Sequence, residues 1–256
     1  MKISRYEIAT NKLKNEIKIA LVADLHDNDS GRVIDALKAE QPDYIMVSGD
    51  LTSRLDSREG EIPEKNGGRV VTHKNAFDFL RAATKIAPVY YSLGNHELCG
   101  HFTRENFGRK ILPKMLEEIK ATGAVLLDDK FVSDGVITVG GLTSGHTNPD
   151  FKPKIAWLDG FARCDGFKIL LSHHPEYYIE YLEKYGFDLV LSGHAHGGQI
   201  RLFGRGVFAP SQGLFPKYTE GKHGSMIISR GLANTVWFSP RLFNPTETVI
   251  INVKPE

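Results

Sequence analysis

The chain has 256 residues, of which 41% are hydrophobic and 25% charged, a composition typical of a globular protein with a sizeable core. Its formal net charge of +1 provides no basic stripe on which nucleic acid would release counterions, so there is no nucleic-acid-binding signal. No stretch approaches the ~18 apolar residues of a transmembrane segment and the N-terminus shows no signal-peptide pattern, so we expect a cytoplasmic protein.

Short apolar runs alternate with amphipathic segments along the chain, which indicates an α/β fold. The apolar runs predict strands at residues 17–23, 44–48, 89–93, 168–171, 189–192, 226–229 and 248–253. Helical spacing predicts helices at residues 31–41, 73–86, 106–122 and 176–185. Turn residues between short apolar runs predict a meander or hairpins at 125–142. No linker or repeat divides the chain, so we expect one domain over residues 1–256.

Five short polar motifs each follow a predicted strand. They are Asp24-Leu25-His26, Gly49-Asp50, Gly94-Asn95-His96-Glu97, His173-His174-Pro175 and Gly193-His194-Ala195-His196. In an open α/β sheet the loops at the carboxyl ends of strands meet in one crevice, so these side chains are predicted to form one site. Carboxylates, a carboxamide and imidazoles are ligands that borderline and hard metal ions prefer. Only one of His173 and His174 is expected to face the crevice, because adjacent side chains of an extended segment diverge.

The order of these motifs, from Asp24 to His196, resembles that of the calcineurin-like metallophosphoesterases. Residues 193–201 and 212–218 are similar to a bacterial branch, the YkuE/YaeI-type phosphoesterases, some of which act on UDP-diacylglucosamine. The resemblance implies two packed mixed β-sheets flanked by helices, in four layers. It also implies a phosphodiesterase or phosphatase that hydrolyses a phosphoester or pyrophosphate bond of a small molecule by attack of a metal-bridging hydroxide.

Carried onto this chain residue by residue, the resemblance implies two metal ions, which would be Mn²⁺, Fe²⁺/Fe³⁺ or Zn²⁺. One ion would be bound by Asp24, His26, Asp50 and His196. The second would be bound by Asp50, Asn95, His173 and His194. Asp50 would therefore bridge the two ions.

His96 is the candidate catalytic residue, because a histidine beside a ligand is suited to protonating a leaving alkoxide near neutral pH. Glu97 would orient His96 or support a ligand. Many relatives carry an aspartate three residues after the counterpart of Asp50, where it orients the histidine, but this chain has Ser53 there. Asp56 is a nearby substitute. Residues 27–29 also depart from the family pattern and would add carboxylates near the metals.

Two long connections have alternative interpretations. Residues 54–75 are interpreted either as a lid over the site or as a solvated loop. Residues 201–223 interleave aromatic and basic side chains, and would form either a wall that recognises an apolar or nucleotide part of the substrate or a loop with its own small core.

Two other functions compete with the phosphoesterase hypothesis. A metallo-β-lactamase-like hydrolase needs a His-x-His-x-Asp-His run, which is absent from the sequence. A non-catalytic binding scaffold of the same fold would have to retain all the predicted ligands for structural metals. This scaffold is the main alternative.

Overall fold

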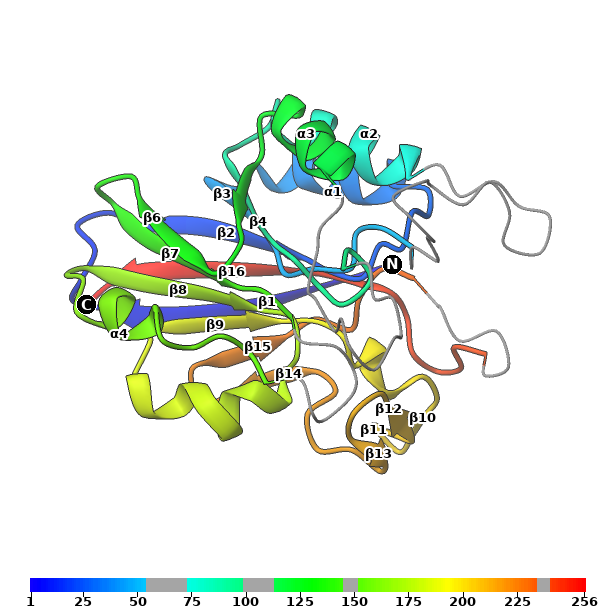
Figure 1. Ribbon diagram of the computed structural model, residues 1–256. Coiled ribbons are helices and arrows are strands. Elements are labelled where there is room, and N and C mark those ends of the chain that lie inside the picture. The colour runs from blue at the N-terminus through cyan, green and yellow to red at the C-terminus, as the bar shows by residue number, and fades with distance from the viewer. Residues whose placement is uncertain (54–72, 99–112, 145–151, 234–239) are drawn as a thin grey trace, which may run out of the picture.

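The computed structural model of the chain describes residues 1–53, 73–98, 113–144, 152–233 and 240–256. Two six-stranded sheets pack face to face, and helices lie against the outer face of each sheet (Figure 1). Residues 54–72, most of the predicted lid or solvated loop, are outside the described residues, as is Asp56. None of the helices in the described ranges is long and apolar enough to span a membrane.

The first sheet places the N-terminal strands next to the C-terminal one. Its strands in spatial order are β1 (Lys2–Thr10), β16 (Glu247–Pro255), β2 (Ile17–Val22), β3 (Tyr44–Val47), β4 (Val89–Ser92) and β5 (Val125–Leu127). Strands β2 to β5 are parallel, and β16 pairs antiparallel with β2. The carboxyl ends of β2, β3 and β4 therefore meet at one edge.

The second sheet also has a parallel centre. Its strands in spatial order are β14 (Gly221–His223), β15 (Met226–Ile228), β9 (Leu189–Ser192), β8 (Phe167–Ser172), β7 (Ile137–Leu142) and β6 (Lys130–Ser133). Strands β15, β9, β8 and β7 are parallel, whereas the two edge strands pair antiparallel with their neighbours. The carboxyl ends of β8 and β9 point to the same end of the molecule as those of β2 to β4 (Figure 1).

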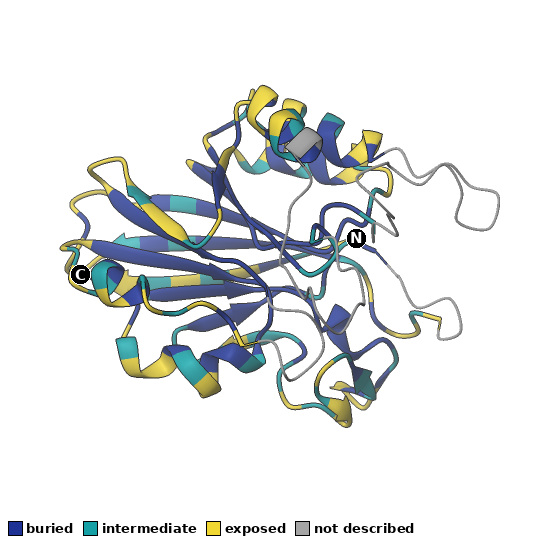
Figure 2. Ribbon diagram, in the orientation of Figure 1, coloured by how far each residue is buried: buried dark blue, intermediate teal, exposed yellow. Residues whose placement is uncertain are grey.

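Helices complete a four-layer structure. The first sheet is covered by α1 (Gly31–Glu40), α2 (Lys74–Ala83) and α3 (Pro113–Ala121). The second is covered by α4 (Leu158–Ala162), the π-helical turn η1 (Tyr178–Leu182) and the 3₁₀ turn η2 (Glu183–Tyr185). Between the sheets lies a core that includes Leu21, Met46, Ile169 and Leu191, all fully buried (Figure 2). This burial on both faces explains the nearly continuous apolar strand runs and confirms the predicted fold class.

Small elements follow β9 along the chain. They are the 3₁₀ turn η3 (His196–Gly198) and the two-residue strands β10 (Arg201–Leu202), β11 (Arg205–Gly206), β12 (Phe208–Ala209) and β13 (Gly213–Leu214). Strands β10 and β11 form one miniature hairpin, and β12 and β13 form another. Both hairpins lie at the same end of the molecule as the strand ends described above (Figure 1).

Several elements differ from the sequence prediction. Strand β1 was not predicted, because charged and apolar residues alternate along it, as an edge strand with only β16 beside it allows. In the segment predicted as a meander or hairpins, β6 and β7 do pair, but β5 belongs to the first sheet. The segment predicted as a helix at residues 176–185 consists mainly of the π-helical turn η1 and the 3₁₀ turn η2. Hydrogen bonds to carbonyls three residues earlier flank it, from the Tyr178 N–H at its start and from the Gly186 N–H at its end.

Candidate metal centre

The predicted ligands converge at the carboxyl ends of parallel strands from both sheets. Ligand atoms of Asp24, His26 and His196 lie within 4.8 Å of one another, and so do those of Asp24, Asp50 and His173. All five residues are buried. In the first sheet, Asp24 and His26 follow β2, and Asp50 follows β3. In the second sheet, His173 follows β8 and His196 follows β9. The centre therefore lies where the two sheets meet.

Most of these residues have an unusual backbone conformation. The φ angles of Asp24, His26, Asp50, His194 and His196 lie between 46° and 66°, in the left-handed region that favours glycine. A non-glycine residue in this region costs about 1–3 kcal/mol and persists only where the surrounding structure enforces it. Such outliers cluster at functional sites, and here they turn successive side chains towards one point.

A hydrogen bond joins the two sheets at Asp24. The backbone N–H of His194 donates to both carboxylate oxygens of Asp24, at 3.1 Å each. The backbone of Gly193 and Gly231 approaches this carboxylate so closely that a Cβ on either glycine would lie 2.7 Å from Asp24 Oδ2. Glycine at these positions therefore lets the second sheet and the loop after β15 close around Asp24.

Asp50 lies between a backbone donor and an imidazole. Its Oδ1 accepts the His96 N–H at 2.9 Å, and its Oδ2 lies 3.1 Å from His173 Nε2. Burial opposes ionisation of Asp50, but the imidazoles of His173 and His96 hold its pKa well below the usual value. Burial likewise opposes the charge on His173, but the Asp50 carboxylate raises the pKa of His173 to about 10. Without an ion, these two side chains form a buried ion pair.

Glu97 holds the loop that carries Asp50. Its buried carboxylate accepts the backbone N–H groups of Asp50 at 2.9 Å, Gly94 at 2.7 Å and Thr52 at 3.0 Å. Burial, together with the nearby charge of Asp50, raises the pKa of Glu97. Of the two roles predicted for Glu97, the contacts favour support of a ligand, because its bonds go to the Asp50 loop.

The histidines are oriented so that Nε2 faces the centre. His173 Nδ1 donates to the Ser48 carbonyl at 2.7 Å, and His196 Nδ1 donates to the Ala233 carbonyl at 2.9 Å. An imidazole that donates from Nδ1 offers its Nε2 lone pair to a metal when it is neutral. The Nε2 atoms of His26 and His196 lie only 3.2 Å apart. Burial also lowers the pKa of His26 well below its usual value, so that this ring is neutral.

This donor set fits metal cations. Two carboxylates and several neutral imidazoles are typical ligands of borderline divalent ions. Within the described residues, the buried atom Asn95 Oδ1 has no hydrogen-bond partner. Buried polar atoms without partners are rare in folded proteins and need an explanation, which a coordinated ion would provide.

The remaining predicted ligands lie at the border of this group. Asn95 is half-buried after β4. His194 is buried with its ring 5.0 Å from that of His173 and 4.0 Å from that of His174, and its Nε2 lies 3.4 Å from Ser211 Oγ. His173 lies among the carboxylates, whereas His174 Nδ1 lies 3.1 Å from Ser144 Oγ. His174 nevertheless belongs to a possible donor group with His173 and His194, which the divergence argument did not predict.

His96 lies at the mouth of the centre. Its side chain is 21% exposed, its Nε2 is 3.9 Å from Asp50 Oδ2, and its ring lies 4.5 Å from that of His26. Burial lowers the pKa of His96. Its Nδ1 is buried and has no hydrogen-bond partner among the described residues. Ser53, which replaces the expected aspartate, instead donates to the His26 carbonyl at 2.8 Å, so it does not orient His96.

Asp27 was expected to add negative charge near the metals. The structure turns it away: its Oδ1 accepts the backbone N–H of Ala76 at 3.0 Å, in the first turn of α2. A carboxylate at a helix N-terminus satisfies a free donor and interacts favourably with the helix dipole. Asp27 therefore links the first metal-binding loop to α2.

The hairpins after η3 carry the aromatic residues that were predicted to form either a substrate-recognising wall or a small loop core. Phe208 and Tyr218 are half-buried, but Phe203 and Phe215 are exposed to solvent. The loop-core interpretation does not fit these two exposed rings, and the recognition wall stays a prediction. The segment between the two hairpins contacts η3, because the Val207 N–H donates to the Gly198 carbonyl at 3.1 Å.

Comparison with known proteins shows which family and which relatives the chain is similar to. A family profile described as calcineurin-like phosphoesterase matches residues 17–198. The uncharacterized metallophosphoesterase Cj0846 of Campylobacter jejuni is 27% identical over 261 residues, which cover 98% of this chain and 63% of that protein. The uncharacterized metallophosphoesterase YkuE of Bacillus subtilis is 26% identical over 220 residues, which cover 81% of this chain and 66% of that protein.

One similar protein has a named activity. The UDP-2,3-diacylglucosamine pyrophosphatase LpxG of Chlamydia muridarum is 30% identical over 183 residues, which cover 67% of this chain and 53% of that protein. The chain thus spans less than two thirds of the length of the Campylobacter protein and about half the length of LpxG.

Proposed function

The chain belongs to the calcineurin-like phosphoesterase family, as its motif order predicted; from this premise we propose that it is a metal-dependent phosphoric ester hydrolase whose centre binds two metal ions. The observation that carries the proposal is the convergence of Asp24, Asp50 and His173, and of Asp24, His26 and His196, within 4.8 Å. We further propose that residues 1–256 act as one catalytic domain.

The proposed ligands form two sets that share one carboxylate. The first set is Asp24, His26, Asp50 and His196. The second set is Asp50, Asn95, His173 and His194. Supporting the bridging role, Asp50 is fully buried and belongs to donor groups on both sides, with His173 and with His26. Mn²⁺, Fe²⁺/Fe³⁺ and Zn²⁺ all suit such mixed ligands.

When bound, such ions acidify a water molecule for attack and neutralise the charge on the phosphoryl oxygens. The protein's own part is to hold the ligands in place before substrate arrives. The Ser48 and Ala233 carbonyls fix the rings of His173 and His196, and Glu97 fixes the loop of Asp50. Such preorganisation lowers the reorganisation needed in the transition state.

We assign protonation of the leaving oxygen to His96. It is the most exposed imidazole of the centre, so its Nε2 is accessible to a substrate while its backbone N–H remains bonded to Asp50. Burial lowers the pKa of His96, which makes its imidazolium a stronger acid. Among the described residues, the contacts of His96 are its backbone N–H bond to Asp50 and the contact of its ring with that of His26.

The substrate class proposed here is a small phosphodiester or pyrophosphate. LpxG is named as a pyrophosphatase, and its similarity supports a pyrophosphate bond among the candidates. The site is built from the same strand ends whichever ester is cleaved, so substrate identity depends on surfaces outside the metal centre.

The test is turnover of bis-nitrophenyl phosphate, nitrophenyl phosphate and a nucleotide pyrophosphate after reconstitution of metal-free protein with Mn²⁺, Fe²⁺ or Zn²⁺. We expect two ions per chain and a fall in kcat of at least about 100-fold for Asp50→Asn. Asp27→Asn is the matched control, because Asp27 lies in the same region but faces α2. Two bound ions without turnover of any ester would favour the binding scaffold, and one ion in a site without Asp50 would contradict the dinuclear assignment.

A further inference from the structure

Three Leu-Phe pairs project from the surface next to the metal centre. They are Leu202-Phe203, Leu214-Phe215 and Leu242-Phe243, and together we call them the Leu-Phe surface. Phe203 is fully exposed, Phe243 is 80% exposed and Phe215 is 74% exposed. Single exposed apolar residues are common, but three protruding phenylalanines, each preceded by an exposed leucine, indicate an interaction site.

The three phenylalanines share an unfavourable backbone conformation. Their φ angles are 50° at Phe203, 50° at Phe215 and 53° at Phe243, in the left-handed region where a bulky residue is an outlier. Glycine or asparagine would adopt this conformation more readily. The three rings are exposed, so they make few packing contacts within the chain that would offset the backbone strain. A stabilising contact for these rings must therefore come from another molecule.

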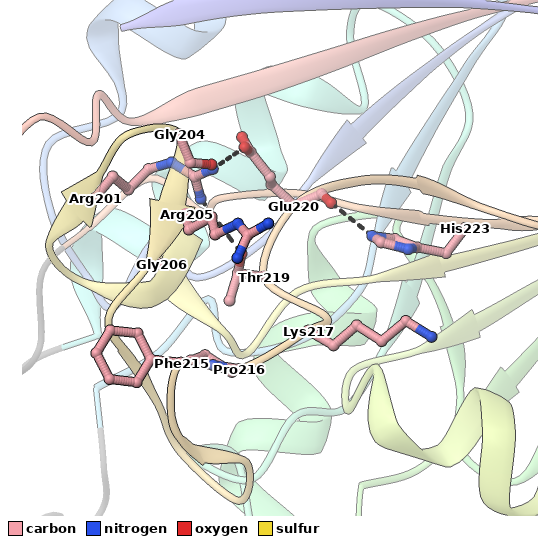
Figure 3. A pocket seen from close by; sticks show the side chains of 10 residues that line it. All are labelled: Arg201, Gly204, Arg205, Gly206, Phe215, Pro216, Lys217, Thr219, Glu220 and His223. Atoms are coloured by element: carbon pink, nitrogen blue, oxygen red, sulfur yellow. Dashed lines mark hydrogen bonds and ion pairs between the residues drawn. The ribbon is translucent and has the colours of Figure 1, made fainter.

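The three pairs form one continuous surface around the β10–β11 hairpin. The Arg201 N–H donates to the Leu242 carbonyl at 3.0 Å, and the Phe215 N–H donates to the Val207 carbonyl at 2.8 Å. A depression of about 480 Å³ is lined by both Phe203 and Phe243. A second, of about 530 Å³, is lined by residues of the β10–β11 hairpin together with Phe215 (Figure 3).

Basic side chains accompany these rings. Arg205 and Lys217 are exposed, each two residues after a phenylalanine, and both line the second depression (Figure 3). Neither forms an ion pair with any residue that the structure describes, and the Lys217 ammonium lies 5.0 Å from the centre of the Tyr218 ring. Glu220 lines the same depression but is already paired with Arg201 and Arg230. The free charge at this surface is therefore positive.

We propose that the Leu-Phe surface docks onto an anionic lipid bilayer. Protruding aromatic and aliphatic side chains would enter the boundary between headgroups and acyl chains, while Arg205 and Lys217 would contact lipid phosphates. A bilayer is favoured over a protein partner because the exposed phenylalanines lie in three separate loops, and because the positive charges of Arg205 and Lys217 match anionic lipid.

Docking in this way would present the metal centre to the membrane surface. The β10–β11 hairpin contacts η3, which begins at His196: a Cβ on Gly198 would lie 2.4 Å from the Gly206 Cα. The binding step itself goes beyond the proposed function and needs no turnover, so its failure and the failure of catalysis are separable.

The experiment is flotation of the purified protein with vesicles of phosphatidylcholine, with and without phosphatidylglycerol. We expect binding to the anionic vesicles that weakens at high salt. Phe203→Asn/Phe243→Asn should lower the partition coefficient at least tenfold, since each change removes a ring that would enter the bilayer and asparagine tolerates the backbone conformation. Arg205→Gln/Lys217→Gln should lower binding to anionic vesicles and leave binding to neutral ones unchanged.

Val136→Asn/Ile179→Asn is the matched control, because both side chains are exposed and apolar but lie outside the Leu-Phe surface. It should float like the unchanged protein, and thermal melts should show that all variants are folded. The proposal is overturned if the unchanged protein does not float, or if the phenylalanine variant floats equally well. A dimer in sedimentation that dissociates in the phenylalanine variant would reassign the surface to contact between copies of the chain.

Discussion

At the scale of single residues, the directions of the proposed ligands are enforced by their neighbours. Asp50 is the clearest case: its φ is 53°, Glu97 accepts its N–H, and a Cβ on Gly94 would lie 2.1 Å from its Oδ1. Removing an enforcing contact should therefore displace Asp50 without touching any proposed ligand atom.

Glu97→Gln tests this enforcement. Glutamine has the same size but only one acceptor oxygen, so its amide nitrogen must face a backbone N–H of Asp50, Gly94 or Thr52. We expect metal affinity or kcat to fall roughly 10- to 100-fold, as for other residues that support ligands. Metal content after dialysis against graded chelator, together with kcat at saturating metal, measures both quantities.

The control for this change is Glu117→Gln, an exposed glutamate of α3. It should bind metal and turn over substrate like the unchanged protein. If Glu97→Gln also retains full affinity and kcat, the position of Asp50 depends on the remaining contacts, and the clamp assigned to Glu97 is wrong.

The sequence predicted which residue types would gather, but not how they would be supported. Spacing and strand ends predicted that Asp24, Asp50 and one of the two adjacent histidines would lie together, and the family resemblance selected His173. The target of Glu97 and the turn of Asp27 towards α2 were not predictable. Both depend on loops with positive φ, where the period-two rule for side-chain direction does not apply.

At the scale of elements, the buried strands were predictable and the edges and short turns were not. An apolar run such as β9 identifies a strand covered on both faces, whereas β1 is an edge strand with charged residues. The 3₁₀ turn η3 depends on distant residues: Asn244 donates to the carbonyls of His196 and Gln199 at 2.7 and 3.0 Å. Contacts across 45 or more residues leave no local pattern in the sequence.

Arg241 is predicted to hold the loop beside η3. Its guanidinium donates to the carbonyls of Asn244, Ala233 and Arg230 at 2.6–2.9 Å, and Ala233 is also the acceptor for His196 Nδ1. Burial lowers the pKa of Arg241 to about 10, so the group is charged at neutral pH. Arg241→Lys keeps the charge but lacks the planar fork that reaches these carbonyls.

We expect Arg241→Lys to lower the free energy of unfolding by about 1–3 kcal/mol, because carbonyls lose their donors. Metal affinity should fall as well, because the Ala233 carbonyl orients His196. Urea unfolding and chelator competition measure the two effects. Arg163→Lys, at the end of α4, is the control; equal behaviour of the two variants would contradict a role for Arg241 in holding the loop.

At the scale of the whole molecule, the proposed metal site joins the two sheets. Loops after β2, β3 and β4 supply Asp24, His26, Asp50 and Asn95, and loops after β8 and β9 supply His173, His194 and His196. Hydrogen bonds also cross this edge, from the His194 N–H to Asp24 and from His173 Nδ1 to the Ser48 carbonyl. Metal binding should therefore stabilise the complete fold rather than one loop.

We expect Mn²⁺ to raise Tm, and to raise it more at higher pH. Free metal at 100 times its Kd adds roughly 2.7 kcal/mol to stability, which corresponds to about 5–10 °C in a domain of this size. His173, with its pKa raised to about 10, stabilises the ion-free protein as an ion pair below about pH 6.5 and less as pH rises towards 10. A metal ligand must be unprotonated, so protons compete with metal and the metal-induced rise in Tm should shrink from pH 8 to pH 6.

Thermal melts with Mn²⁺ or with chelator at both pH values measure this difference, and Asp50→Asn should abolish it. A rise that is equal at both pH values would mean that His173 gives up no proton when metal binds, which contradicts its place among the proposed ligands.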